Sequence, residues 1–310
     1  NTHALNLRNI FDTDANEILY TIPPFQRNYS WKKDNVSALW DDVLESHNNE
    51  NIDSSTAQYL LGATVLIPED GTHYNRIIDG QQRFATLTLY FCAIRDLYLE
   101  LTGKLPEDAE LLKIIANYQT KDSRTERVSW KLTLNDVDRE LFEKFQDYQN
   151  KDTSFITYDQ KAKNVATYRK RSHKFLRDAY KTLYESILDW MVEKHCSNDI
   201  LKTTTMAEKK ILIKNYAPSL LSLSKNTMKN IFFVVINGKD NTTTILRDSD
   251  AFQIFETLNT RGQTLNKSNL VKSLILSCLS SKKFKPGRKS LSEPEFIKLN
   301  KQIQEKWDII

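Results

Sequence analysis

The chain has 310 residues, 40% of them hydrophobic and 27% charged, with a formal net charge of +4. This length allows a large buried core or two domains, and the apolar fraction excludes a disordered chain. Its 7 glycines and 7 prolines exclude collagen-like and low-complexity chains, and so few glycines argue against a glycine-rich P-loop or Rossmann enzyme.

The cysteines and histidines show no spacing typical of a metal site. Cys92, Cys196 and Cys278 are an odd number at wide spacing, which indicates reduced thiols in a cytoplasmic protein. The five histidines form no HxxxH or HExxH pattern, so zinc is not expected. No run of about 18 apolar residues predicts a transmembrane helix, and we expect no membrane partner.

The first elements are a strand and a helix. Glu17–Ile22 is expected to form a short strand that ends at two prolines. Ser30 is expected to cap a helix from Trp31 to about His47, since apolar residues there recur with a period of 3.6.

Two strands and a long helix follow. Tyr59–Pro68 is a nearly continuous apolar run of strand length, and His73–Ile78 is a second strand behind a hairpin signal at Asp70-Gly71. Asp79-Gly80-Gln81-Gln82-Arg83 then opens an amphipathic helix that is expected to stop at Gly103. A strand, a tight turn and a helix start form the geometry of an anion site.

Residues 110–230 are predicted to be mainly helical, with clear periodicity in Leu183–Val192 and Met206–Tyr216. Residues 161–177 carry seven basic side chains with no acidic residue between them, which fits either a solvated helix face or a surface for a phosphate backbone. The candidate DNA-binding residues in this segment are Lys163, Arg169, Lys170, Arg171 and Lys174.

The C-terminal third begins with a predicted buried strand, Ile231–Ile236. Two helices, Asp250–Leu258 and Asn269–Leu279, are expected on either side of a turn at Asn259–Gly262. The chain ends within an amphipathic segment, Glu293–Ile310, and we expect the parent protein to continue beyond it.

Asp79–Arg83 carries the strongest candidate chemistry. Gly80 allows a tight turn and close approach of a ligand, and the amides at the helix start favour an anion by about 0.3–1 kcal/mol per charge. Arg83 is expected to point away from the core as an exposed, forked phosphate donor. Gln81 and Gln82 could orient a water or bind ribose or base, and Asp79 could hold Mg²⁺ or a hydroxyl. A helix cap in a surface turn is the alternative interpretation.

Two other segments repeat this chemistry. Phe25–Trp31 holds the pair Gln26 and Arg27 ahead of a helix, and Phe255–Leu265 offers a further arginine beside a flexible turn. Taken alone, the first is also explained by aromatic packing, and the second by a simple connection between helices.

These three segments, in this order, resemble the N-terminal domain of GmrSD-type restriction endonucleases, a domain also found in the defence proteins SspE and BrxU. The matching stretches are IPPFQRNYSW at 22–31, LLGATVLI at 60–67, IIDGQQRFATLTL at 77–89 and FETLNTRGQTLNKSNLVKSLIL at 255–276. Asn269 stands where the family usually has Asp.

The resemblance implies an α+β fold, in which a small ParB/sulfiredoxin-like mixed sheet with helices is followed by a mainly helical region. Its implied division is a nucleotide-binding core at 1–110, a helical region at 111–230, a segment at 231–280 that completes the pocket, and a basic linker with the start of a helix at 281–310.

The resemblance also implies binding and hydrolysis of a nucleoside triphosphate, with Mg²⁺, to control an HNH-type nuclease that acts on modified DNA. No HNH site is found in this sequence, so the chain resembles the regulatory half of such a system. The implied catalytic residues are Asp79, Gln81 and Arg83, with Asp79 as Mg²⁺ ligand, and the implied nucleotide-binding residues are Gln26, Arg27, Gly80, Gln82, Arg83, Asn259, Arg261 and Gly262.

Two alternatives stay open. The first is a non-hydrolysing, nucleotide-gated DNA-binding module of the ParB kind, with residues 161–177 as its DNA surface. The second is a nuclease in its own right, which is disfavoured because carboxylates and histidines do not cluster with metal-ligand spacing. A homodimer is a further partner to be tested.

Overall fold

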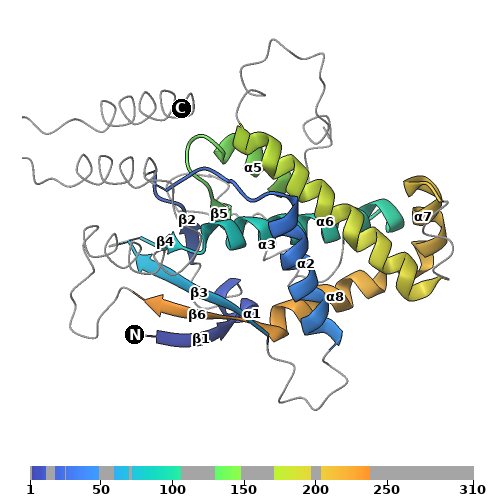
Figure 1. Ribbon diagram of the computed structural model, residues 1–310, viewed down its shortest axis with the longest axis horizontal. Helices are drawn as coiled ribbons and strands as arrows, with labels where there is room; N and C mark the ends of the chain where they lie inside the picture. The colour runs from blue at the N-terminus through green and yellow to red at the C-terminus, as the bar shows by residue number, and fades with distance from the viewer. Residues whose placement is uncertain are drawn as a thin grey trace, which may run out of the picture.

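The computed structural model of the chain describes residues 2–11, 18–24, 26–48, 59–69, 72–105, 130–147, 171–196 and 204–237. These residues form a mixed sheet flanked by helices (Figure 1), which confirms the predicted α+β class. The strands are β1 (Thr2–Asn6), β2 (Leu19–Thr21), β3 (Tyr59–Pro68), β4 (Tyr74–Asp79), β5 (Leu132–Thr133) and β6 (Ile231–Asn237). The helices are α1 (Leu7–Phe11), α2 (Lys33–Asn48), α3 (Gln81–Thr102), α5 (Arg139–Gln146), α6 (Arg171–His195), α7 (Met206–Ile213), the 3₁₀ turn η4 (Lys214–Tyr216) and α8 (Pro218–Asn230).

The described strands form one six-stranded sheet in the order β1-β6-β3-β4-β2-β5. The pairs β1–β6 and β3–β4 are antiparallel, and the other three pairs are parallel. β6 comes last in the sequence among these strands, yet it lies between β1 and β3. The predicted division of the chain at residues 110, 230 and 280 stays a prediction.

The predicted strands are found with small shifts in their ends. β3 has the predicted bounds, β6 extends the predicted strand by one residue, and β2 is shorter than Glu17–Ile22. β4 begins and ends one residue later than predicted, and it pairs with β3 as a hairpin requires.

The main core lies between the sheet and the helices, and α3 occupies its centre. Ile231, Phe233 and Val235 alternate along β6 and are buried, as expected for a strand with one face on a core. The Phe233 ring packs against Phe84 of α3, with 5.4 Å between ring centroids. α3 also contacts α5, α6 and α8, so its side chains are buried almost all the way round. It ends as predicted at Gly103, which has a φ of 73°.

A buried arginine ties three helices together. Arg95 of α3 donates hydrogen bonds to the backbone oxygens of Phe145 and Gln146, at 2.8 and 2.7 Å, where α5 ends. Its Nε also bonds Asp96, whose other oxygen accepts a hydrogen bond from Tyr180 of α6. Lysine or arginine groups bound to terminal carbonyls favour a helix end, so this contact fixes α5 against α3.

The predicted cap at Ser30 is wrong. α2 begins at Lys33 rather than at Trp31, and the Lys32 N–H bonds the side chain of Asn35. The Ser30 N–H instead donates to the side chain of Gln82, 52 residues away in sequence. A tertiary contact has therefore replaced the local capping geometry that the sequence favoured.

Several predicted elements lie outside the described residues. They are the hairpin turn at Asp70-Gly71, the two helices between 250 and 279, and the amphipathic segment from 293 to 310. Cys92 and Cys196 are free thiols, as predicted, whereas Cys278 lies outside the described part. Within the described part, every helix is too short or too polar to cross a bilayer.

Candidate functional site

Two of the three predicted segments are bonded to each other. The Gln26 Nε2 group donates to the backbone oxygen of Ile78 at 2.8 Å, directly before Asp79. The side chain of Gln82 accepts from the Ser30 N–H at 2.8 Å and donates to the backbone of Asn28 at 3.3 Å. The segment before α2 is therefore held against the start of α3. The third segment, with Asn259, Arg261 and Gly262, lies outside the described residues.

Gly80 forms the turn between β4 and α3, and its geometry requires glycine. Its φ is 97°, and an added Cβ would lie 2.8 Å from the hydroxyl oxygen of Thr64. That hydroxyl donates to the backbone oxygen of Asp79 at 2.7 Å. Thr64 belongs to β3. Strand β3 therefore holds the Gly80 turn, where α3 begins, through this hydrogen bond, and only glycine fits in the space that is left.

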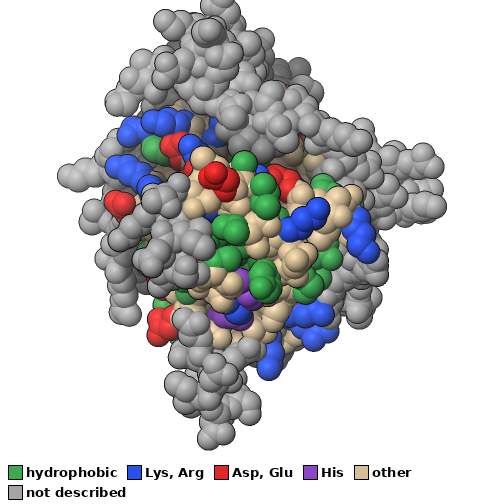
Figure 2. All heavy atoms as spheres, turned by 90° about the vertical axis from the view of Figure 1, so that its right-hand side faces the viewer, with side chains coloured by type: hydrophobic (Ala, Val, Ile, Leu, Met, Phe, Trp, Pro, Cys, Tyr) green, Lys and Arg blue, Asp and Glu red, His purple; other side chains and the backbone are tan. Residues whose placement is uncertain are grey.

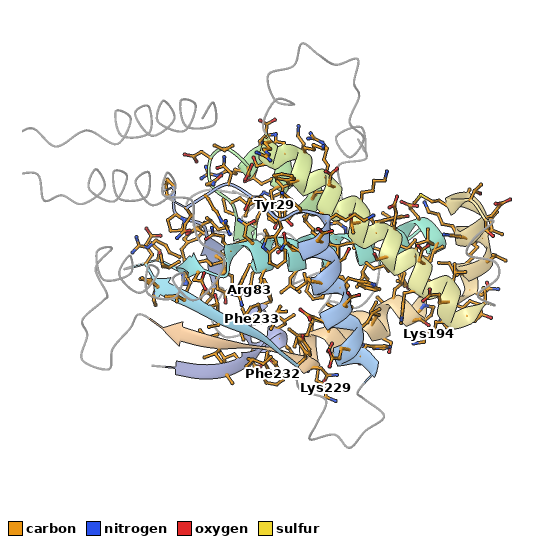
Figure 3. All side chains as sticks on the ribbon, viewed as in Figure 1. Tyr29, Arg83, Lys194, Lys229, Phe232 and Phe233 are labelled. Carbon is orange, nitrogen blue, oxygen red and sulfur yellow. The ribbon has the colours of Figure 1, made fainter. Side chains whose placement is uncertain are left out.

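Arg83 does not extend into solvent, so the expectation of an exposed arginine is wrong. Its Nη2 donates to the backbone oxygen of Ala63 at 2.6 Å, and its Nη1 donates to that of Leu61 at 3.2 Å. The guanidinium also lies over the ring of Phe233, 5.5 Å from its centroid (Figure 3). Its side chain is 20% exposed. Arg83 therefore links α3 to β3 through hydrogen bonds and has a structural role. Phosphate binding by Arg83 stays a prediction.

Gly62 makes room for that guanidinium. Its φ is 127°, and an added Cβ would stand 2.3 Å from the Nη1 atom of Arg83. The parallel pairing of β3 with β6 also shifts register between Leu60 and Gly62. A bulged glycine is typical of a strand that another group must approach closely.

Asp79 is a mostly buried carboxylate between two arginines. Burial raises its pKa, although Arg83, the Gly80 N–H and Arg27 each act to lower it. Its Oδ2 lies 3.4 Å from the Arg83 Nη2. Within the described part of the chain, no three His, Cys, Asp or Glu side chains gather around a metal position. Asp79 as a single carboxylate still fits Mg²⁺, which takes one or two protein carboxylates and completes its shell with water and phosphate.

A small pocket opens beside the start of α3. Its interior measures about 10 Å³, the space of one water molecule. Gln81 lines it and is only 6% exposed, and its Oε1 has no hydrogen-bond partner among the described residues. The Oε1 of the buried Gln26 is also unpartnered there. A buried carbonyl without a donor is costly, so this arrangement suits a bound water or ligand.

Arg27 is the arginine that faces this pocket. Burial lowers the pKa of its guanidinium, and the charge of Asp79 partly opposes that shift. Its guanidinium makes no hydrogen bond to any residue that the structure describes. Arg27, rather than Arg83, therefore has its donors free for an anion at this site.

The sequence analysis missed two residues of the pocket, Asn135 and Asp138. The Asn135 Nδ2 donates to the side chain of Asn28 at 3.0 Å. Asp138 is fully buried, and its carboxylate accepts from the Tyr29 N–H at 2.8 Å and from the Ser172 hydroxyl at 2.5 Å. The Asp138 N–H bonds the Asn135 side chain at 3.2 Å. That local turn was readable from the sequence, whereas its long-range partners were not.

The basic segment is described only in part. Lys163, Arg169 and Lys170 lie outside the described residues, whereas Arg171 and Lys174 are exposed in the first turns of α6. The guanidinium of Arg171 lies over the ring of Phe175, 5.5 Å from its centroid. Arg177, which was counted in the basic run, is buried and donates to the backbone oxygen of His173. It is therefore not part of a basic surface.

Comparison with known proteins gives one family. A family model described as GmrSD restriction endonuclease, N-terminal domain, matches residues 7–276, which is most of the chain. No curated protein matches the chain.

Proposed function

The chain belongs to the family of GmrSD restriction endonuclease N-terminal domains, and on this premise we propose that it binds and hydrolyses a nucleoside triphosphate as the regulatory domain of a cytoplasmic, modification-dependent restriction system. Its proposed partners are modified DNA and an HNH-type nuclease domain or subunit. Nucleotide turnover would then control when the nuclease acts.

The observation that carries this proposal is the buried, unpartnered Oε1 of Gln81, a residue that lines a pocket the size of one water. Phosphoryl transfer to water needs little covalent chemistry from the protein, but it needs an oriented water and positioned positive charge. Gln81 is suited to accept a hydrogen bond from that water. Arg27 is suited to donate to a phosphate oxygen, because the described structure leaves its guanidinium without a hydrogen bond.

The small interior of the pocket limits what it holds. About 10 Å³ accepts one water but not a triphosphate. We therefore place the attacking water inside the pocket and the phosphates outside it, next to Arg27 and Asp79. Asp79 would hold Mg²⁺, which supplies charge neutralisation at the phosphates when it is bound.

The test is phosphate release from GTP, ATP, CTP and UTP by the 310-residue chain with Mg²⁺. Gln81→Ala should lower kcat by about 100-fold with little change in KM, because it removes the group that orients the water. Arg27→Ala should weaken nucleotide binding by about 10- to 150-fold. Arg139→Ala is the matched control, since Arg139 is half-exposed on α5. Full turnover by Gln81→Ala would contradict the assigned role.

A non-hydrolysing, nucleotide-gated DNA-binding module is the second candidate function. One contact favours it: Asp138 lines the pocket and also bonds Ser172, next to Arg171 at the start of α6. A ligand that moves Asp138 would therefore act on the described end of the basic segment. Tight nucleotide binding without phosphate release would support this function over hydrolysis.

A further inference from the structure

Helix α8 presents one polar, basic side to the outside. Its exposed residues are Pro218, Ser222, Lys225 and Lys229. They recur at intervals of four, three and four residues, so they form a single stripe along a helix of 3.6 residues per turn. The sequence of α8 contains no Asp or Glu, so the charge of this stripe is only positive.

The opposite side of α8 is fixed in the core. Leu220 and Met228 are buried. The hydroxyl of the buried Thr227 is hydrogen-bonded to the hydroxyl of Tyr90 on α3, at 2.8 Å. The exposed stripe is therefore held in place on the side of α8 that faces away from α3.

The ends of α2 and α6 extend this stripe along one flank of α8. The Asn226 Nδ2 lies 3.0 Å from the His47 Nδ1 at the end of α2, and the His47 Nε2 lies 3.4 Å from the Lys194 Nζ at the end of α6. The His195 Nε2 lies 2.9 Å from the Ser219 Oγ on the same flank. Three helices that are distant in sequence therefore contribute to one continuous surface.

We call Ser222, Lys225, Lys229, His47 and Lys194 the α8 surface. Figure 3 shows that Lys194 and Lys229 lie along the edge of the molecule that α8 follows. Figure 2 faces the end of the molecule where α6 stops, and it shows histidine side chains beside Lys or Arg side chains there.

The α8 surface carries three lysines and no carboxylate among its members. The acidic residues nearest to them in sequence are Glu45, about 200° from His47 around α2, and Glu193, about 100° from Lys194 around α6. Burial and the charge of Lys194 lower the pKa of the neighbouring His195, so this ring adds no positive charge near pH 7. We therefore count the three lysines as the charge of the surface.

We propose that the α8 surface binds the phosphate backbone of duplex DNA. Lysines together with short hydroxyl and amide side chains are groups that contact phosphates and sugars. Lys and Ser are depleted in protein–protein interfaces, which are enriched in aromatic side chains, so the composition favours DNA over a protein partner. The 13 residues of α8 span about 20 Å, the length of about six base pairs. The choice of DNA rests on the proposed function, whereas the position of the contact rests on this surface.

The α8 surface is distinct from the basic segment at the other end of α6. Lys174 lies 20 residues before Lys194, so it is about 30 Å away along α6 and about 200° away around it. The two lysines are on opposite sides of α6, and one straight duplex does not contact both. Variants of each lysine group therefore distinguish the two surfaces.

The test is fluorescence anisotropy of a labelled, unmodified duplex of about 20 base pairs with the 310-residue chain, without nucleotide, at about 50 to 200 mM salt. We expect a dissociation constant of about 10–100 µM at 0.1 M salt, which is typical of sequence-independent binding. The double variant Lys225→Gln, Lys229→Gln should weaken binding about tenfold per lysine at this salt concentration, and should reduce the slope of log K against log salt by about 2.

The matched control is the double variant Lys174→Gln, Lys181→Gln. It removes the same charge from two exposed lysines of α6, and it should bind within about threefold of the parent because salt screens distant charges. Thermal melting checks that each variant is folded. Equal weakening by the two pairs would overturn the proposal. So would a parent that leaves the duplex unbound at about 50 mM salt and 200 µM protein, or one that binds poly-glutamate in preference to the duplex.

This test is independent of nucleotide hydrolysis. α8 meets α3 at Tyr90, nine residues or about 14 Å beyond Gln81. Phosphate release measured without DNA should therefore be the same for the parent and for Lys225→Gln, Lys229→Gln. Weaker DNA binding with unchanged release supports the proposal. Absence of release from both proteins contradicts the proposed hydrolysis and leaves the result on DNA binding in force.

Discussion

Replacing Arg83 by alanine tests whether this arginine stabilises the fold by linking α3 to β3. The change removes two hydrogen bonds from a charged donor to the backbone of β3, at 2.6 and 3.2 Å. It also leaves the mostly buried Asp79 without the arginine nearest to it. Breaking a buried charged contact on one side typically costs about 3–5 kcal/mol. This exceeds the roughly 0.5 kcal/mol expected for an exposed arginine.

Thermal melting without nucleotide measures this cost directly. At about 2 °C per kcal/mol for a domain of this size, Arg83→Ala should melt roughly 6–10 °C below the parent. Arg139→Ala is the control, because Arg139 is half-exposed in an ion pair with Asp136. It should melt within about 1 °C of the parent. An empty Arg83→Ala protein that melts like the parent would refute the structural role, and Arg83 would then be free to bind phosphate.

Three further predictions use neighbouring residues. Gly62→Ala should destabilise the chain far more than Gly103→Ala, since its Cβ would meet the Arg83 Nη1 at 2.3 Å whereas nothing lies within 4 Å at Gly103; equal melting points would contradict this. Burial raises the pKa of Asp79, so its contribution to stability is present below its ordinary pKa of 3.8 and is lost as the pH rises through the folded value. The melting temperature of the parent minus that of Asp79→Asn should therefore fall from about pH 4 to 7, and a rising difference would show that the Arg83 pair outweighs burial. Asp138→Ala should cost about 2–5 kcal/mol in urea unfolding, because two buried donors lose their acceptor; a cost below about 1 kcal/mol would mean that water replaces the carboxylate.

Elements whose signals are local were predicted closely. β3 is a continuous apolar run, and α3 has a regular apolar period that ends at a glycine. The type and the ends of each element can therefore be predicted from its own short stretch of sequence. The start of α2 was mispredicted because the Ser30 N–H bonds Gln82 rather than serving its own helix. Contacts across such distances leave no trace in local propensity.

The candidate site shows the same limit. The resemblance assigned Gln26, Arg27 and Gln82 to one site, and the structure places the Gln26–Ser30 segment in contact with Ile78 and Gln82. Nucleotide binding at that site stays a prediction. The direction of the Arg83 side chain on α3 was mispredicted because it depends on the space that Gly62 leaves on strand β3. Asp138 was missed because an aspartate before α5 is a typical helix cap, whereas its carboxylate bonds Tyr29 and Ser172 instead. A single sequence gives the residue type at each position, but it does not show which hydrogen-bond donor from a distant part of the chain will contact that residue.

The central position of β6 has a consequence for biosynthesis. β6 (residues 231–237) pairs with residues 59–66 of β3 on one side and with β1 on the other. Within the described sheet, β6 is the strand that pairs with β1. A ribosome that adds about 5–20 residues per second needs roughly ten to thirty seconds to make the chain between the two paired strands. During that interval β3 has an open edge and β1 has no neighbour in this sheet, which is the condition under which nascent chains pair wrongly or recruit chaperones. The completed sheet is also rich in contacts between distant residues, so we expect refolding on the scale of seconds rather than milliseconds.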